Sequence, residues 1–193
     1  KIIATAAGMR VRSDAALAAS SGDLVLAANG ALSVRSAAAA RNVDITVTGT
    51  ATNNGQILAG GNLALAAASL DNRGQFMAAM GDIAVTAPAL DNAGGAIVAG
   101  GDLSLALPGA SFDLSGAQAG ILAAGGEMAI QADTLVNSGS FGHTGPLHLT
   151  ASTFTNSGLL VTQGAATLDA DTIVNSGTLA AGKTEPDRIT MPD

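Results

Sequence analysis

Apolar residues along the chain recur in short clusters in which every second position is apolar. Leu63 and Leu65 form one such pair, and Leu103 and Leu105 form another. Alternation with a period of two is the pattern of a β-strand that buries one face. No cluster keeps helical spacing for even two turns. The pattern therefore predicts an all-β chain built from short strands.

The clusters repeat every 19 or 20 residues between positions 53 and 177. Each unit carries an Asn-x-Gly sequence, and successive Asn residues lie 19, 20, 45, 19 and 19 positions apart. The interval of 45 spans two units, because one irregular unit has Leu114 in the Asn place. A unit this short cannot bury its own apolar face, so it must stack on its neighbours. The repeat predicts a solenoid.

Three apolar positions recur in each unit. The first follows the corner glycine, and its members are Ile57, Phe76, Ile97, Ile121, Phe141, Leu160 and Leu179. The second is an alternating pair, as in Leu63 and Leu65, Ile83 and Val85, Leu103 and Leu105, Met128 and Ile130, Leu147 and Leu149, and the weaker Ala166 and Leu168. The third lies two residues before the Asn, at Leu70, Leu90, Phe112, Leu135, Phe154 and Ile173. Three short strands per coil, separated by glycine-containing corners, predict a parallel β-helix.

The Asn-x-Gly corners predict an internal ladder of amides. Stacked inward Asn side chains can each donate to one neighbour and accept from the other, which satisfies a buried amide. We expect this structural role for Asn53, Asn72, Asn92, Asn137, Asn156 and Asn175, with ligand binding as the alternative. The glycine two residues later is expected to adopt the left-handed conformation. These corner glycines are Gly55, Gly74, Gly94, Gly139, Gly158 and Gly177.

The clarity of the repeat divides the chain. Residues 51–182 repeat clearly, and residues 1–50 read as degenerate coils of the same stack. The whole stack, residues 1–182, is expected to hold about nine or ten coils. Residues 183–193 carry two Pro and a cluster of charges, so they read as a tail or linker. We expect the chain to be a piece of a longer repetitive protein.

Composition narrows the function classes. The net charge is −7, and no Lys or Arg occurs between Gly74 and Gly182. Nucleic-acid binding needs a basic surface, so it is excluded as a function. No apolar run is long enough for a membrane-spanning helix. The chain has no Cys, which removes disulfides and thiol-based zinc sites and suits a polypeptide exported unfolded.

Candidate chemistry is sparse. Asp71, Asp91 and Asp113 occupy matching places, and outward projection would make them a short acidic column. Paired carboxylates serve glycoside hydrolysis, but Arg73 is the one basic group nearby. The expectation is turn-forming Asp with adventitious cation binding at most. A second acidic set, Asp82, Asp102 and Glu127, precedes the second strand of its units and is expected to solvate the strand start.

His143 and His148 are the two histidines of the chain, and both are expected to be exposed and without a metal. We therefore predict no catalytic, metal or cofactor site and no enzymatic activity.

Two features could mark a binding surface. The loop at 108–111 should bulge outward, and Val136 and Val174 make one face more apolar toward the carboxyl end. Ordinary repeat drift is the favoured explanation of both.

The segments 57–65 and 97–105 resemble haemagglutinin-type repeats, which build the shafts of filamentous haemagglutinins and of contact-dependent growth inhibition exoproteins in Gram-negative bacteria. The resemblance covers about residues 48–182. It implies a right-handed β-helix, secretion through an outer-membrane transporter by two-partner secretion, and display on the bacterial cell surface. The implied function is a structural shaft of an adhesin. The alternative is a segment that binds a receptor or glycan of a host cell or neighbouring bacterium, and a β-helical polysaccharide-active enzyme is a remote third.

Overall fold

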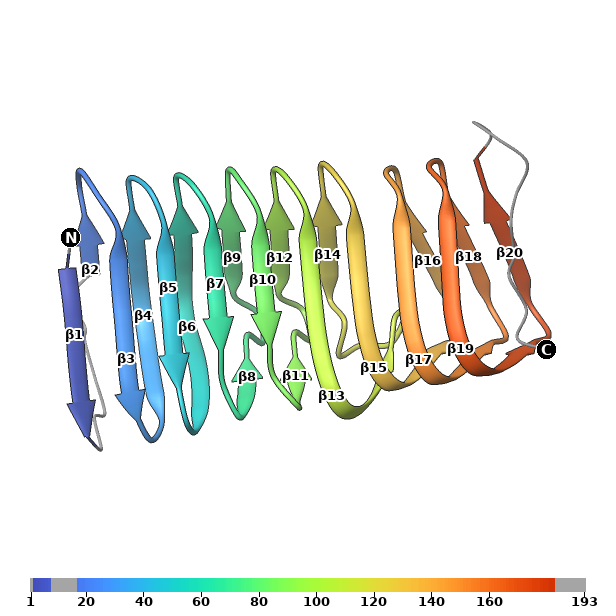
Figure 1. Cartoon of the computed structure of the whole chain (residues 1–193), viewed down its shortest axis with the longest axis horizontal. Helices are drawn as coiled ribbons and strands as arrows, with labels where there is room; N and C mark the ends of the chain where they lie inside the picture. Colours follow the sequence, from blue (N-terminus) through green and yellow to red (C-terminus); the bar gives the residue numbers. More distant parts are fainter. Residues whose placement is uncertain (1, 8–16, 183–193) are drawn as a thin grey trace.

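The structure of the chain, a computed structural model, describes residues 2–7 and 17–182 (Figure 1). Every regular element in these ranges is a β-strand, and every strand pairing is parallel. The prediction of an all-β solenoid is therefore confirmed. The described residues include no helix long and apolar enough to cross a bilayer. The tail predicted at 183–193 lies outside the described residues.

One sheet of nine strands runs the whole length of the stack and takes one strand from each coil. Its strands are, in spatial order, β1 (Ile2–Ala7), β3 (Leu24–Asn29), β5 (Val43–Val47), β7 (Leu63–Ala66), β10 (Ile83–Thr86), β13 (Leu103–Asp113), β15 (Met128–Asn137), β17 (Leu147–Asn156) and β19 (Ala166–Asn175). Chain order and spatial order agree, as stacking of successive coils requires.

The opposite side of the stack is divided between two sheets. An eight-stranded sheet contains β2 (Leu17–Ala19), β4 (Leu32–Ala39), β6 (Thr50–Ala59), β8 (Ser69–Asp71), β9 (Phe76–Ala79), β11 (Leu90–Asp91), β12 (Ala96–Ala99) and β14 (Ile121–Ala124). A three-stranded sheet contains β16 (Ser140–His143), β18 (Leu159–Thr162) and β20 (Thr178–Ala181). In the described part of the chain, β14 pairs with β12 but not with β16, so the hydrogen-bonded ladder stops between them.

The coils wind in the right-handed sense. In Figure 1 the chain advances from left to right, while strands of the near sheet point down and those behind point up. This is the hand that a right-twisted strand favours when it crosses over to a parallel neighbour. The nine-stranded sheet takes one strand from each of nine coils, within the nine or ten predicted, and the eight steps between these coils give about eight turns.

Within the described residues, the three strands expected in each coil are separate in two coils, β7-β8-β9 and β10-β11-β12. In coils toward the amino terminus, one bent strand carries both the third apolar position before the Asn-x-Gly corner and the first apolar position after it, as in β6. Toward the carboxyl terminus the second and third positions join instead, as in β15, β17 and β19. A strand passes through a corner whenever the corner residues stay extended and keep pairing with the coil beside them.

Inward side chains stack in columns along the axis. One column consists of Leu24, Val43, Leu63, Ile83, Leu103, Met128 and Leu147, which are paired in register. Each of these side chains is at most 1% exposed. Burying one such side chain contributes roughly 1.5–3 kcal/mol relative to leaving it in water. The core is therefore a narrow aliphatic filling, which explains how the chain folds with 2% aromatic residues.

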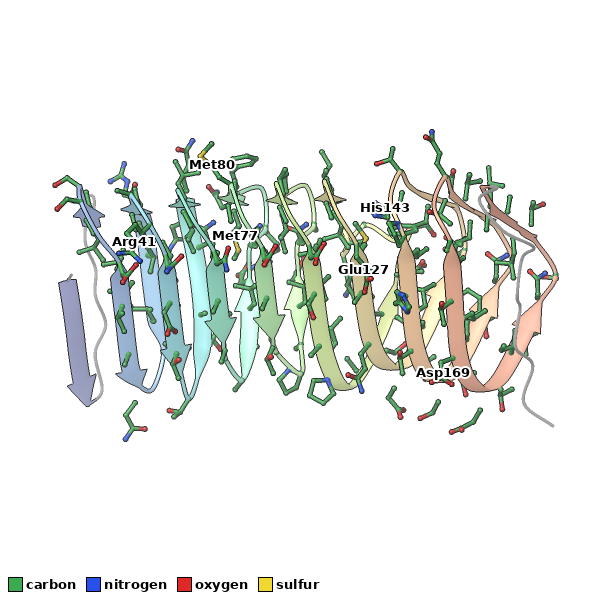
Figure 2. All side chains as sticks on the ribbon, turned by 45° about the horizontal axis from the view of Figure 1, so that its top comes forward. Arg41, Met77, Met80, Glu127, His143 and Asp169 are labelled. Carbon is green, nitrogen blue, oxygen red and sulfur yellow. The ribbon has the colours of Figure 1, made fainter. Side chains whose placement is uncertain are left out.

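Two residues predicted to face inward face outward instead. Phe76 is 38% exposed, whereas Met77 is fully buried and aligns with Ile57. Ile121 is 62% exposed, and Leu122 takes its place beside Ile97. The corner after Asn72 contains one residue more than the corner after Asn53, which shifts the alternation by one. Figure 2 shows Met77 inside the stack.

Candidate functional site

The first three Asn residues of the Asn-x-Gly corners form a buried hydrogen-bonded series. Asn53 Nδ2 donates to Asn72 Oδ1 at 2.7 Å, and Asn72 Nδ2 donates to Asn92 Oδ1 at 2.6 Å. Asn72 and Asn92 are fully buried. Each amide points into the stack because it follows an inward apolar residue by two positions. Asn92 ends the series by donating to the backbone carbonyl of Ala119 at 2.6 Å.

A second series begins two coils later, after the coil that carries Leu114. Asn137 Nδ2 donates to Asn156 Oδ1 at 2.7 Å, and Asn156 Nδ2 donates to Asn175 Oδ1 at 2.8 Å. Asn137 and Asn156 are fully buried, but Asn175 is exposed at the last described coil. We name these the amino-terminal Asn ladder (Asn53, Asn72 and Asn92) and the carboxy-terminal Asn ladder (Asn137, Asn156 and Asn175).

Leu114 separates the two ladders. The register pairs Asp113 with Val136, which places Leu114 beside Asn137. Leu114 is 3% exposed, and its side chain has no hydrogen-bond donor. Asn137 Oδ1 is consequently a buried side-chain atom without a partner within the described ranges. Leaving a buried acceptor unpaired costs about 1–3 kcal/mol, so the break has an energetic penalty.

The corner glycines fall into two groups. Gly74 and Gly94 have φ of +66° and +65°, the left-handed conformation that was predicted. The other four have no positive φ, so the prediction is wrong for Gly55, Gly139, Gly158 and Gly177. They are glycines because a Cβ would press on the preceding coil. At Gly158 it would overlap the carbonyl oxygen of Gly139, and at Gly139 it would meet Ser115 Cβ at 3.2 Å.

A third ladder, which the sequence analysis did not predict, lines another corner of the stack. A side-chain oxygen of every member but the last accepts a hydrogen bond from the backbone N–H of the equivalent residue one coil later, at 2.7–3.2 Å, and the last member, Glu127, only donates its N–H. We call this the corner ladder, and its members are Asp23, Asn42, Asn62, Asp82, Asp102 and Glu127. It ends where the next coil presents Pro146, which has no N–H to donate. The signal in the sequence was that Asn, Asp or Glu recurs at the same place in successive units.

The corner ladder explains the Gly-Gly-Asn/Asp-Leu sequences. A Cβ at Gly61 would overlap Asn42 Oδ1, and a Cβ at Gly101 would overlap Asp82 Oδ1. The second glycine of each sequence therefore makes room for the accepting oxygen of the preceding coil. The expected role of Asp82, Asp102 and Glu127 as solvating charges is incomplete, because Asp82 and Asp102 also accept backbone hydrogen bonds from the next coil.

The predicted acidic column contains two stacked carboxylates rather than three. Asp71 pairs in register with Asp91, and Arg73 bridges them, with its Nη2 at 2.7 Å from Asp71 Oδ2 and its Nε at 3.6 Å from Asp91 Oδ2. The hydrogen bond from the Arg73 side chain lowers the pKa of Asp71. The same bond raises the pKa of Arg73.

Asp113 pairs with Val136 and is separated from the Asp71–Asp91 pair. Ser138 Oγ donates to Asp113 Oδ2 at 2.6 Å, and Ser115 Oγ donates to Asp113 Oδ1 at 2.9 Å. Partial burial raises the pKa of Asp113, but the hydrogen bonds from Ser138 and Ser115 outweigh it and lower the pKa. A general acid needs a raised pKa, so neither Asp71 nor Asp113 has the electrostatics of one.

An open groove of about 480 Å³ lies between the stacked Asp pair and the bulge of β13. Asp71, Arg73, Asp91 and Gln118 provide its polar groups, and Leu107 and Phe112 are buried beneath it. The groove follows from an interrupted ladder, because β11 pairs with β8 but not with β13. The bulge has a register shift between Leu107 and Ser111, with Gly109 at a φ of +72°.

The sequence pattern of the haemagglutinin repeat family matches residues 2–36, 38–75, 78–106, 111–165 and 161–185. These ranges cover most of the chain. The chain belongs to the haemagglutinin repeat family. No curated protein and no solved structure matches it. The matched ranges contain both Asn ladders and the corner ladder, so the three ladders are features of this chain's haemagglutinin repeats.

The two histidines of the haemagglutinin repeat stack differ in environment. His148 is exposed, and its Nε2 lies 3.7 Å from Glu127 Oε2. His143 was expected to be exposed, but it is 8% exposed, with its Nε2 at 3.1 Å from the Gly126 carbonyl oxygen. Alternation after the inward Phe141 turns it into the stack. The described residues contain no group of three His, Asp or Glu side chains arranged to hold a metal ion.

Val136 and Val174, which were expected to make one face more apolar toward the carboxyl end, differ in exposure. Val136 is partly buried, and Val174 is 51% exposed.

A second groove, of about 330 Å³, lies where β14 and β16 do not pair, and its lining includes Leu122, Gly142, His143 and Val161. Both grooves therefore adjoin the one irregular coil, 103–127. Neither brings together the nucleophile, base and oxyanion donors of an active site.

Proposed function

We propose that this chain is a shaft segment of a secreted bacterial surface adhesin, where it sets the distance between the cell and adhesive or effector regions. The observation that carries the proposal is the in-register nine-stranded sheet, which continues through every described coil. Each coil contacts only its neighbours, so length increases in steps of about 4.8 Å without a change in architecture. Membership in the haemagglutinin repeat family supports the adhesin context.

Export by two-partner secretion is part of the proposal. The polypeptide passes an outer-membrane transporter unfolded and then folds coil by coil on the outside. The absence of Cys from the sequence suits this route, because no disulfide can close a loop before passage. Coil contacts are local in sequence, so folding can proceed from whichever end emerges first. The chain acts at the cell surface without a catalytic step.

Deletion of whole coils tests the shaft function. Removing residues 63–102 deletes two coils and joins Asn62 to Leu103. Leu63 and Leu103 occupy the same place in their coils, because each pairs with Ile83, so Leu103 can follow Asn62 as Leu63 does. This variant should keep its strand circular dichroism and become about 10 Å shorter in small-angle scattering. Removing residues 63–92 is the control, because it cuts within a coil and should unfold the stack. Equal unfolding of both variants would contradict a modular shaft.

The groove beside the β13 bulge favours a second candidate, a segment that binds a receptor or glycan. It combines Arg73, two carboxylates and Gln118 with an apolar floor, which is a set of groups suited to a polyhydroxylated ligand. A glycan and receptor binding screen separates the candidates. Binding that is lost in Arg73→Ala and Gln118→Ala, but kept in Arg41→Ala at a remote corner, supports the second. A screen that finds no glycan or receptor leaves the shaft as the one supported function.

A further inference from the structure

The irregular coil occupies two levels of the stack at the Asn-x-Gly corner. Asn92 N–H donates to the Gln118 carbonyl oxygen at 2.8 Å, so Ala119 takes the Asn place in the level after Asn92. Leu114 N–H donates to the Val136 carbonyl oxygen at 2.8 Å, so Leu114 takes the Asn place one level further on. Between Leu114 and Ala119 the chain runs back through a turn. One coil therefore supplies two levels of this corner.

The doubled corner leaves one strand position open on the side opposite the nine-stranded sheet. β14 follows Ala119 in the first of the two levels, whereas β16 follows Asn137, two levels later. Within the described residues β14 pairs with β12 alone and β16 pairs with β18 alone. Figure 1 shows the interval between β14 and β16, and the groove of about 330 Å³ lies in it. We call this interval the open strand position, and residues 122–124 and 142–144 form its two edges.

The open strand position is short and is closed at both ends. The turn after Leu114 lies at one end. At the other end the coils come together again, because a Cβ at Gly145 would overlap the Gly126 carbonyl oxygen. At a rise of about 3.3 Å per residue, the position has room for about three extended residues. An occupant must therefore enter from the solvent side.

The β14 edge presents backbone groups that no strand takes up. Gly125 N–H donates to the Ala99 carbonyl oxygen of the preceding coil at 3.0 Å. In a parallel ladder, alternate residues direct both N–H and C=O to the same side. Leu122 and Ala124 therefore direct theirs away from β12, into the open strand position. Within the described residues no strand pairs with this edge.

The β16 edge faces it with a glycine. Gln163 N–H donates to the His143 carbonyl oxygen at 3.1 Å, so by alternation Gly142 directs its N–H and C=O into the open strand position. The fold of the chain does not require this glycine. Its φ is not positive, and an added Cβ would meet only the Val161 carbonyl oxygen, at 3.8 Å. A strand glycine without a local cause marks a place where another backbone or a ligand approaches closely.

The core is incompletely covered at the same place. Ile57, Met77 and Ile97 form one inward column and are at most 2% exposed. Leu122 continues the column but is partly exposed, because the next level supplies no strand to cover it. The groove lining contains no Asp, Glu, Lys or Arg. An occupant is therefore expected to be uncharged and to place an apolar side chain over Leu122.

We propose that the open strand position binds an extended, uncharged segment of another protein as an added strand. The groups that face the position are backbone donors and acceptors at strand spacing, and an extended polypeptide is the ligand whose two edges match them. A second copy of the stack does not supply such a segment, because every described strand is already held in a ladder. The bound segment would join the eight-stranded and three-stranded sheets into one. This site is separate from the groove beside the β13 bulge.

An NMR titration of the chain with a hexapeptide tests the proposal. The probe is Gly-Ala-Ile-Val-Ala-Gly, which copies residues 95–100, because these residues already pair with the opposite edge of β14 and place Ile97 beside Leu122. The amide signals of Leu122, Ala124 and Gly142 should shift and saturate. The control peptide has N-methyl groups on its Ile and Ala backbone nitrogens, which keep the apolar side chains but remove donors. It should bind at least tenfold more weakly.

Two variants of the chain locate the binding. Gly142→Val fills the open strand position with a side chain for which the free chain has room, and it should weaken peptide binding at least tenfold. Ala78→Val enlarges an outward side chain of β9, which is paired on both sides, and should leave binding within twofold. Circular dichroism and urea denaturation check that both variants keep the fold.

Three outcomes overturn the proposal. The first is the absence of any shift at about 1 mM peptide, which corresponds to the weakest specific binding worth the name. The second is equal binding of the N-methylated peptide, because apolar contact alone would then explain the shifts. The third is equal binding by Gly142→Val, because the peptide would then lie elsewhere on the stack.

Discussion

The coils before position 103 and those after 127 are built from the same repeat but are held together differently. The first group has the amino-terminal Asn ladder, the corner ladder and the left-handed glycines at 74 and 94. The second group has the carboxy-terminal Asn ladder and long bent strands such as β15 and β17, and the corner ladder ends at Pro146. Both groups share only the nine-stranded sheet.

The irregular coil at 103–127 interrupts the Asn ladder and the sheets opposite the nine-stranded sheet, whereas the corner ladder crosses it from Asp102 to Glu127. The Asn ladder breaks at Leu114, the eight-stranded sheet ends at β14, and β11 does not pair with β13. A repeat stack tolerates this because its stability is a sum of neighbour interactions, and one continuous sheet still joins the two groups. The comparison shows that backbone pairing in the nine-stranded sheet joins the two groups of coils, whereas a side-chain ladder can end in one coil and begin again in a later one.

The largest effect is expected at a glycine under close contact. Gly158→Ala places a Cβ against the Gly139 backbone, which must force the two coils apart. We expect a loss of about 3 kcal/mol in the free energy of unfolding, measured by urea denaturation. Gly74→Ala is the comparison, because its Cβ meets nothing within 4 Å and only the positive φ is strained. It should cost about 1 kcal/mol. Equal costs would mean that the two corner types are equivalent.

Removing the middle of an Asn ladder should have the next largest effect. Asn72→Ala leaves the buried Asn92 oxygen without its partner and leaves the Asn53 amide with only the Phe76 carbonyl, at 3.2 Å. We expect a loss of about 2 kcal/mol in the free energy of unfolding. Asn175→Ala affects an exposed residue at the last described coil and should cost less than about 1 kcal/mol, because water can replace it. Unchanged stability in Asn72→Ala would contradict a buried amide series.

The break between the ladders can be tested by a polar substitution in the core. Leu114→Asn loses apolar burial worth about 2 kcal/mol but offers a donor to the unpaired Asn137 Oδ1. The two terms nearly cancel, so stability should change by less than about 1 kcal/mol. Leu107→Asn, in the same strand region and fully buried, has no such acceptor and should lose about 3 kcal/mol. Similar losses in both would mean that Asn137 is not reached from position 114.

The smallest effect concerns acid sensitivity next to the break. Because the pKa of Asp113 is lowered in the folded chain, its stabilising contribution is present above the unfolded value near 3.9 and is lost as pH falls through the folded value. Chemical denaturation between pH 5 and pH 2 should therefore show a shallower loss of stability in Asp113→Asn than in the unmodified chain. Asp44→Asn, at an exposed position of β5, is the control. An identical pH profile in Asp113→Asn and the unmodified chain would contradict the stabilising hydrogen bonds.

Much of the fold follows from local pattern. The period of 19 or 20 residues and the alternation at Leu63 and Leu65 are enough for a parallel stack, because short strands of this kind have no other way to bury one face. Asn72 and Asn156 could be placed in the interior because they follow an inward residue at a spacing of two. The family resemblance seen in the Gly-Gly-Asn/Asp-Leu segments agrees with the matched haemagglutinin repeats.

Misplaced residues share one cause. The place after the corner glycine favours Phe76 and Ile121, but Met77 and Leu122 are the residues that align with Ile57 and Ile97. His143 was expected to be exposed, yet it is the last residue of β16 and is buried on the same side of that strand as Phe141. In each case the number of residues in a corner decides which side of the strand faces inward, and a corner of four or five residues has no reliable sequence marker.

The sequence by itself determined that this protein is a β-solenoid with amides stacked along its axis, because the spacing of apolar residues and the place of the Asn can be read from each repeat. Only the tertiary structure decided the corner ladder, the two grooves and the orphaned oxygen of Asn137, since these depend on how one coil meets the next. A single Leu in an Asn place becomes a break only once coils of unequal length are brought into register.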